Sequence, residues 1–149
     1  MVDPYPIVDY AINTTRMQAD QKHIQIHSEM EKDLPKIYVD EEKTAWVLTN
    51  FITNAIRYSP LNAEIWIWVK QVGNLLEFAV RDHGRGIDKH YQEKVFDRYF
   101  QIPGSLRTGT GLGLSISKDF IENQGGSIGL KSELGVGSTF YFQIPIAKD

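Results

Sequence analysis

The sequence predicts an α+β domain, a two-layer α/β sandwich in which helices cover one face of a single mixed, mostly antiparallel sheet. Helical and strand patterns occur in comparable number along 149 residues, a length that suits one domain. Short glycine turns at 73–74 and 135–137 separate the later strand pairs, and such turns join antiparallel neighbours. A doubly wound parallel sheet needs a helical crossover between its strands, so these turns argue against it.

The first part of the chain predicts a disordered end, a helix and a strand. Residues 1–5 form the expected disordered end, and Pro6 suits the first turn of a helix that extends to about Gln21. That helix is indicated by one stripe of residues at helical spacing: Ile7, Val8, Ala11, Ile12, Thr15 and Ala19. Alternation with polar residues over 24–30 then predicts a strand.

A second helix and a strand pair follow. Asp40 is a good N-cap, and the helix that it starts is expected to end near Tyr58. Ile65, Ile67 and Val69 alternate with Trp66 and Trp68, which predicts a strand. Residues 75–81 predict a second strand that runs back beside the first.

The last part of the chain begins with a long irregular stretch. Periodicity fails over residues 82–110, apart from a short helix expected at 90–96, and long irregular loops in compact domains tend to be functional. Residues 112–124 predict a helix that a glycine pair ends. Strands at 127–132 and 138–145 complete the sheet.

The composition excludes several classes of function. A net charge of −3 and a pI near 5.8 leave no basic field for nucleic acid or acidic lipid. The absence of cysteine excludes disulfides and thiolate metal sites. No apolar run approaches the ~20 residues of a membrane span, and no signal peptide opens the chain. We therefore expect a soluble, cytoplasmic domain without direct membrane contact, and any membrane anchor of a parent protein would lie outside this sequence.

A polar stripe lies within the second predicted helix. Asn50, Asn54 and Arg57 fall at i, i+4 and i+7, on one helical face. Asparagine favours caps and turns over helix interiors, so two in register suggest a functional reason. Amide oxygens are neutral ligands that suit Mg²⁺, and an arginine can hold a phosphate. The alternative is a solvated stripe on an amphipathic helix.

Two glycine-containing segments follow. Residues 82–87 read Asp-His-Gly-Arg-Gly-Ile directly after a predicted strand, where the aspartate could accept a hydrogen bond from an exocyclic amine and the glycines admit a flat ring. An ordinary glycine turn is the simpler explanation of that segment alone. Residues 109–114 read Gly-Thr-Gly-Leu-Gly-Leu and open the last helix, where backbone N–H groups form a natural anion site. This segment matches neither the Walker A loop nor the dinucleotide fingerprint.

In this order, the segments resemble the N, G1, F and G2 boxes of the catalytic domain of two-component sensor histidine kinases, within the Bergerat (GHKL) ATPase superfamily. The corresponding segments are residues 50–59, 82–87, 95–100 and 109–114. The flanks at 125–128 and 132–140 resemble the closing strands of the family, so the resemblance covers nearly the whole chain. It implies the Bergerat sandwich and one catalytic, ATP-binding domain over residues 1–149, with a flexible ATP lid at 88–110.

The resemblance also implies roles for single residues. Asn54 would be the main Mg²⁺ ligand with Asn50 in support, and Arg57 would reach a phosphate; these are the expected catalytic residues. Tyr58 would line the adenine of ATP, and Asp82 would bind its amine. Further ATP-binding residues would shape the pocket, anchor the lid or form its hinge: Gly84, Gly86, Ile87, Phe96, Phe100, Arg107, Thr108, Gly109, Thr110, Gly111, Leu112, Gly113 and Leu114.

The implied activity is transfer of the γ-phosphoryl group of ATP to a histidine on the separate helical dimerisation domain of a parent kinase, with a response regulator downstream. Related ATPases and anti-sigma serine kinases have a glutamate base where Asn50 stands. An asparagine cannot act as that base, which favours an already nucleophilic imidazole as acceptor. Two alternatives remain open: a serine kinase or ATPase of the same superfamily, and a degenerate nucleotide-binding interaction module.

Two departures from a complete kinase accompany the resemblance. Many family members have an arginine where Gln101 stands, and Arg98 or Arg107 would have to replace its contact with the γ-phosphate. The chain also lacks a recognisable phospho-acceptor, because two of its histidines flank a strand and two belong to the loop: His23, His27, His83 and His90.

Overall fold

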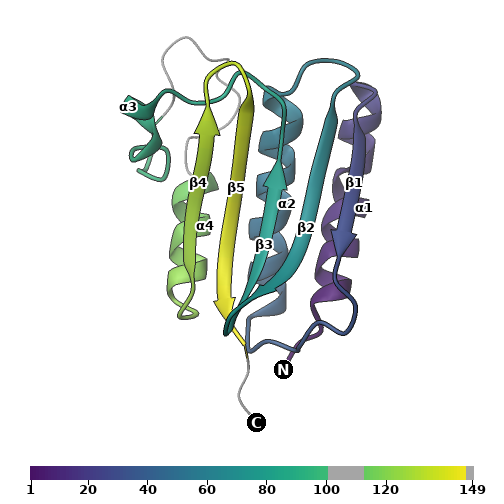
Figure 1. Ribbon diagram of the computed structural model, residues 1–149, viewed down its shortest axis with the longest axis vertical. Helices are drawn as coiled ribbons and strands as arrows, with labels where there is room; N and C mark the ends of the chain where they lie inside the picture. Colours follow the sequence, from purple (N-terminus) through teal and green to yellow (C-terminus); the bar gives the residue numbers. More distant parts are fainter. Residues whose placement is uncertain (101–112, 147–149) are drawn as a thin grey trace.

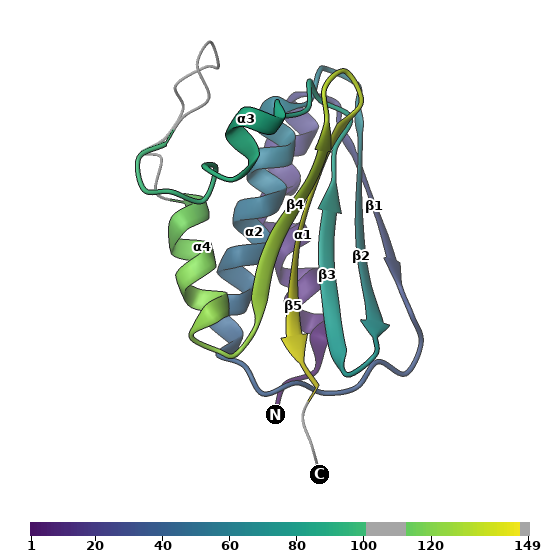
Figure 2. The ribbon, with the colours of Figure 1, turned by 60° about the vertical axis from the view of Figure 1, so that its left-hand side comes forward.

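The computed structural model describes residues 1–100 and 113–146. In this part of the chain a five-stranded sheet is covered on one face by α1, α2 and α4, and the short α3 lies near the top of both views (Figures 1 and 2). The predicted α+β sandwich is confirmed. The elements are α1 (Pro4–Gln21), β1 (Gln25–Met30), α2 (Glu41–Tyr58), β2 (Glu64–Val72), β3 (Leu75–Arg81), α3 (Lys89–Gln92), α4 (Gly113–Glu122), β4 (Ser127–Glu133) and β5 (Gly137–Pro145).

The sheet is mixed, in the order β1-β2-β3-β5-β4. β1 pairs with β2 in parallel, and the other neighbouring strands are antiparallel. The parallel pair is connected through α2, which supplies the crossover that parallel strands require. The β2–β3 and β4–β5 hairpins turn at the predicted glycines, where Gly73 and Gly135 have φ of 61° and 79°. Because Arg81 pairs with Thr139, the end of β3 meets the start of β5.

The core lies between the sheet and the helices, with α2 at its centre. The ring of Phe51 on α2 lies 5.6 Å from that of Phe140 and 5.9 Å from that of Phe142, measured between centroids. Phe78 stacks on Phe142 at 4.8 Å. Full burial of a phenylalanine side chain stabilises a fold by about 1.5–3 kcal/mol. This packing fixes the backbone of α2, and with it the polar residues along the edge of that helix.

The amino-terminal residues differ from the expectation of a disordered end at 1–5. The carboxylate of Asp3 caps α1 by accepting a hydrogen bond from Tyr5 N at 3.0 Å, and α1 begins at Pro4. Val2 and Ile37 exchange two backbone hydrogen bonds, of 2.8 and 3.0 Å. An N-cap together with a proline at the helix start favours an earlier beginning than the apolar stripe alone suggested.

The helix expected at 90–96 is also shorter. α3 ends at Gln92, and residues 93–96 continue as turns. The side chain of Asp88 caps α3 by accepting from His90 N at 3.0 Å. Within the turns, Val95 is buried while Lys94 is exposed. None of the helices in residues 1–100 and 113–146 is both long and apolar enough to cross a membrane.

Candidate functional site

The polar stripe of α2 lies at the border between the core and the surface. Asn50, Asn54 and Arg57 are half-buried, so the stripe is not the fully solvated face of an amphipathic helix. The guanidinium group of Arg57 donates to Asn54 Oδ1 at 3.4 Å, and Asn50 Nδ2 donates to Ser117 Oγ of α4 at 3.4 Å. Both contacts are long for hydrogen bonds, and they leave amide oxygens able to accept another ligand.

The first turn of α4 lies directly against this stripe. A Cβ added to Gly113 would lie 2.7 Å from Asn50 Oδ1, so a larger residue at this position would push the Asn50 amide out of its place. Ser117, which is fully buried, donates from Oγ to Gly113 O at 2.8 Å and links this turn to Asn50. Leu114 is half-buried in the same turn. The amino terminus of α4, where backbone N–H groups and the helix dipole favour an anion, therefore faces the polar edge of α2.

Asp82 forms a second polar centre, directly after β3. The residue is only 5% exposed. Its Oδ1 accepts hydrogen bonds from Gly84 N at 2.9 Å and Ser138 N at 3.2 Å. Within residues 1–100 and 113–146, both hydrogen bonds to this side chain end on Oδ1, which leaves Oδ2 to accept from a ligand. Burial raises the pKa of the Asp82 carboxyl group above its ordinary 3.8, while the two backbone bonds and the charge of His83 act in the opposite direction.

The glycines of the Asp82 loop have protein neighbours. A Cβ on Gly84 would lie 2.6 Å from the carbonyl oxygen of Tyr58, at the end of α2. Gly86 has a φ of 76°, and a Cβ there would clash with the carbonyl oxygen of Glu133 on β4. The sequence alone suggested that these glycines admit a flat ring. In the structure they let the loop pack between α2 and the β4–β5 hairpin.

A hydrogen-bond network that sequence reasoning missed holds the far side of the loop. The hydroxyl of Ser132 accepts from Ile87 N at 2.7 Å and contacts the hydroxyl of Ser138 at 2.8 Å. The Gln92 side chain donates to the carbonyl oxygens of Ile87 at 2.8 Å and Ser132 at 3.1 Å. The resemblance of the 132–140 flank to the family pointed to this region, but nothing in the sequence singled out Gln92.

The predicted lid anchors, Phe96 and Phe100, are half-buried and pack against the core. Phe96 lies edge-on to Phe140 at 6.2 Å between ring centroids, and Phe100 lies 5.9 Å from Tyr91. Arg98, a candidate for the missing phosphate contact, is exposed and pairs with Asp119 of α4 at 3.6 Å.

Part of the predicted site lies outside the described residues. These residues are Arg107, Thr108, Gly109, Thr110, Gly111 and Leu112, together with Gln101 and most of the predicted lid after Phe100. In the described part, the structure brings Asn50 against Gly113 and the end of α2 against the Asp82 loop.

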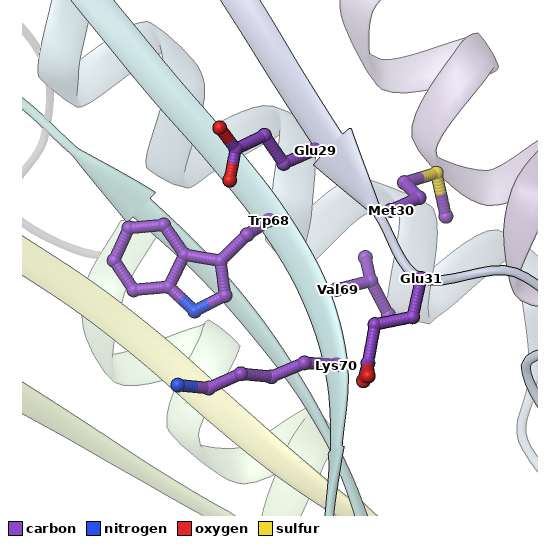
Figure 3. A pocket seen from close by; sticks show the side chains of 6 residues that line it. All are labelled: Glu29, Met30, Glu31, Trp68, Val69 and Lys70. Carbon is purple, nitrogen blue, oxygen red and sulfur yellow. The ribbon is translucent and has the colours of Figure 1, made fainter.

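A shallow pocket elsewhere holds none of the predicted site residues. It lies where β1 ends, has a volume of about 460 Å³, and is lined by Glu29, Met30, Glu31, Trp68, Val69 and Lys70 (Figure 3). Two of its polar groups already have protein partners: Trp68 Nε1 donates to Glu77 Oε2 at 3.2 Å, and Glu31 Oε1 accepts from Gln71 N at 2.7 Å. The candidate site therefore remains the edge of α2 with the Asp82 loop.

Comparison with known proteins places this chain in a family. Residues 39–148 match the family described as histidine kinase-, DNA gyrase B-, and HSP90-like ATPase. The sensor-like histidine kinase SenX3 of Mycolicibacterium smegmatis is 37% identical over 147 residues, which cover 97% of this chain and 38% of SenX3. The chain spans 22–38% of the length of the first curated relatives that it matches.

Solved structures share the fold. Full-length ShkA in complex with AMPPNP has a TM-score of 0.89 at 27% identity, over 99% of this chain and 31% of the ShkA chain. The histidine kinase ThkA in complex with response regulator protein TrrA has a TM-score of 0.83 at 23% identity, over 98% of this chain and 41% of that chain. The arrangement of sheet and helices is thus shared with these histidine kinase structures.

Proposed function

This chain belongs to the family of histidine kinase-, DNA gyrase B- and HSP90-like ATPases and is the ATP-binding catalytic domain of a histidine kinase, and from that premise we propose that it transfers the γ-phosphoryl group of ATP to a histidine on a separate domain. Its relatives are sensor kinases, which places the chain in signal transduction. Phosphoryl transfer depends mainly on positioning and on charge stabilisation, so the argument rests on how the site holds a nucleotide.

The buried carboxyl group of Asp82 is the observation that supports the proposal most strongly. Its Oδ1 is occupied by the N–H groups of Gly84 and Ser138, and its Oδ2 is left to accept. A carboxylate only accepts hydrogen bonds, so it matches the exocyclic amine of adenine, whereas guanine presents a carbonyl oxygen at that position. We propose that Asp82 selects ATP over GTP, with Tyr58, Gly84, Gly86 and Ile87 around the base.

The phosphate end of the site is assigned to α2 and α4. Asn50, Asn54 and Arg57 lie along the half-buried edge of α2, and the close approach at Gly113 brings the amino terminus of α4 beside them. A cationic side chain and the backbone N–H groups of a helix amino terminus are the donors that a polyphosphate needs. Leu114 and the residues of 107–112 remain proposed members of this end, and Phe96 and Phe100 remain proposed anchors of the lid.

Mg²⁺ fits the donor set that α2 presents. Mg²⁺ prefers oxygen ligands and keeps several waters, so it is usually held by one or two side chains and the phosphates of the substrate. Asn54, with Asn50 in support, offers amide oxygens for this purpose. Groups of three or more His, Cys, Asp or Glu able to hold a metal are absent from residues 1–100 and 113–146, so a carboxylate cage does not compete for the ion there. When bound, Mg²⁺ would neutralise charge on the phosphates.

Asn50 supports transfer to a histidine over hydrolysis. An amide cannot take a proton from a water or a serine hydroxyl, whereas a histidine nitrogen attacks without a base. The histidines of this chain are poorly suited as acceptors. The ring of His27 on β1 stacks on Trp66 of β2 at 4.4 Å, and His83 lies beside Asp82 at the proposed adenine end. We therefore propose that the acceptor belongs to the helical dimerisation domain of the parent kinase.

The proposed partners follow from this assignment. The kinase ThkA has the same fold and was solved in complex with a response regulator, and we propose a response regulator as the downstream partner of the parent protein here. We place the domain in the cytoplasm, where ATP and such regulators are found.

Calorimetric titration with ATP, ADP and GTP tests the nucleotide assignment. ATP and ADP should bind in the presence of Mg²⁺. GTP should bind at least about tenfold more weakly, because a charged hydrogen bond contributes about 1.5–3 kcal/mol. Equal affinity for ATP and GTP would refute the role of Asp82, and no binding of ATP would refute the proposed function.

A further inference from the structure

We infer that Lys22 is a positioning residue that holds the adenine end of the ATP site together, an inference that rests on the function proposed above. Lys22 follows α1, outside every segment assigned to the site. Its ammonium group donates hydrogen bonds to three backbone carbonyl oxygens at the end of α2. They belong to Ile56 at 2.8 Å, Arg57 at 3.3 Å and Ser59 at 2.6 Å.

The end of α2 needs these donors. The last four carbonyl groups of a helix have no partner within it, and the helix dipole makes this end negative. In α2, Ala55 O accepts from Ser59 N at 3.1 Å. The ammonium group of Lys22 satisfies the carbonyl oxygens of Ile56 and Arg57, together with that of the C-cap residue Ser59. An ammonium group has three donors, so these contacts use its full capacity. Lys22 therefore serves as the cationic cap of α2, supplied from a different helix.

The backbone of Lys22 is anchored as firmly as its side chain. Its N–H donates to Ala19 O at 3.1 Å, and its carbonyl oxygen accepts from Asn62 N at 2.9 Å. Lys22 is half-buried, so solvent and salt screen its charge less than they would at an exposed position. The residue thus joins the end of α1 to the end of α2 and to the loop before β2.

The turn that Lys22 holds touches the Asp82 loop directly. The carbonyl oxygen of Tyr58 lies so close to Gly84 that an added Cβ would come within 2.6 Å of it. The N–H of Gly84 in turn donates to Asp82 Oδ1 at 2.9 Å. A shift of this turn would move Gly84, and with it the carboxyl group that we propose accepts the adenine amine. Figure 1 shows the ends of α1, α2 and β3 together at one end of the sheet, opposite both termini.

This placement predicts which part of the nucleotide is affected. Tyr58 and Asp82 are assigned to the base, which ATP and ADP share. Asn54 and Asn50 lie one and two turns earlier on α2, where core packing holds the helix without Lys22. Arg57, the third residue assigned to the phosphates, receives the longest of the three Lys22 contacts, at 3.3 Å to its backbone oxygen, so its guanidinium group should be affected less than the turn at Ser59. Loss of the lysine should therefore weaken ATP and ADP by the same factor, with or without Mg²⁺. A role at the phosphates would instead weaken ATP more than ADP.

The test compares Lys22→Met with Lys22→Arg and with Lys32→Met, which removes an exposed lysine at another site. Lys22→Met should weaken ATP and ADP roughly three- to thirtyfold by calorimetry, the usual range for a residue that acts through others. Lys22→Arg should recover most of this loss because its guanidinium group donates to carbonyl oxygens as well. Lys32→Met should bind as the unmodified chain does.

Thermal unfolding of the same proteins separates positioning from stability. The titrations are made well below each Tm, beside Ile37→Val. This control shortens a fully buried side chain that pairs with Val2 and Ile146, near the termini, and should destabilise the fold away from the site. A purely structural lysine would lower Tm and leave the affinity of the folded protein unchanged, and that result would overturn the inference. A loss confined to ATP would also overturn it. If Lys22→Met does not fold, Lys22→Gln is judged by the same criterion. Failure of the unmodified chain to bind ATP would refute the proposed function, and this inference with it.

Discussion

The Asp82→Asn substitution separates the binding role of this carboxyl group from its effect on the fold. Burial raises the pKa of Asp82 above 3.8. A group whose pKa is higher in the folded state contributes stability below its unfolded pKa, and this contribution is lost as the pH rises through the folded pKa. At neutral pH the buried carboxylate therefore costs stability. Asparagine removes the charge and keeps an oxygen for the N–H groups of Gly84 and Ser138, so Tm should stay the same or rise.

The same substitution should weaken nucleotide binding strongly. The asparagine NH₂ group would take the place of Oδ2 and meet the adenine amine donor to donor. A hydrogen bond to a charged acceptor contributes about 1.5–3 kcal/mol, which corresponds to an affinity loss of roughly 10- to 150-fold. ATP and ADP should lose affinity together, and the discrimination against GTP should relax, because an amide can donate to the guanine oxygen.

Calorimetry and thermal unfolding of Asp82→Asn, with Asp9→Asn as control, measure both effects. Asp9 is an exposed aspartate on α1, and its replacement should change neither quantity. The reasoning is refuted if Asp82→Asn lowers Tm and leaves the affinity for ATP unchanged, because the carboxyl group would then be structural.

Three further predictions concern the rest of the site. Asn54→Ala should remove the Mg²⁺-dependent part of ATP affinity while Tm changes little. ATP titrations in Mg²⁺ and in EDTA measure this, and an unchanged effect of Mg²⁺ would refute the metal assignment. ADP affinity should fall as the pH drops through the raised pKa of Asp82, because protonation removes an acceptor, and a pH series on Asp82→Asn should be flatter. Ser132→Ala should destabilise the fold by about 1–3 kcal/mol in denaturant unfolding, since Ile87 N loses its partner; no loss would mean that water replaces the hydroxyl.

The sequence predicts the elements with strong periodicity well. The start of α2 at Asp40 and the hairpin between β2 and β3 follow from a cap and a glycine turn, both of which are local signals. The buried face of α2 is encoded by its apolar spacing, and the polar stripe beside it by the two asparagines. These features need no knowledge of the rest of the chain, which is why they can be predicted.

Features that depend on distant contacts could not be predicted. Lys22 looks like any polar residue after a helix, and its importance emerges only when α1 and α2 end side by side. Gly84 and Gly86 were predicted from the space that a ligand needs, and the structure adds a second reason for glycine, because a Cβ at either position would meet backbone atoms of Tyr58 or Glu133. The amino terminus was expected to be disordered because the pairing of Val2 with a residue 35 positions away leaves no local pattern.

Transfer of phosphate in trans tests the central claim most directly. The chain is incubated with γ-labelled ATP and Mg²⁺, alone and with a separately prepared helical dimerisation domain that has its own exposed histidine. Labelled proteins are then separated under conditions that preserve acid-labile phosphohistidine. We predict label on the added domain and none on this chain, because an acceptor must meet the γ-phosphate nearly in line and at close range. Two results would contradict the account: stoichiometric label on this chain when it is incubated alone, or no label on the histidine of the dimerisation domain from the parent kinase.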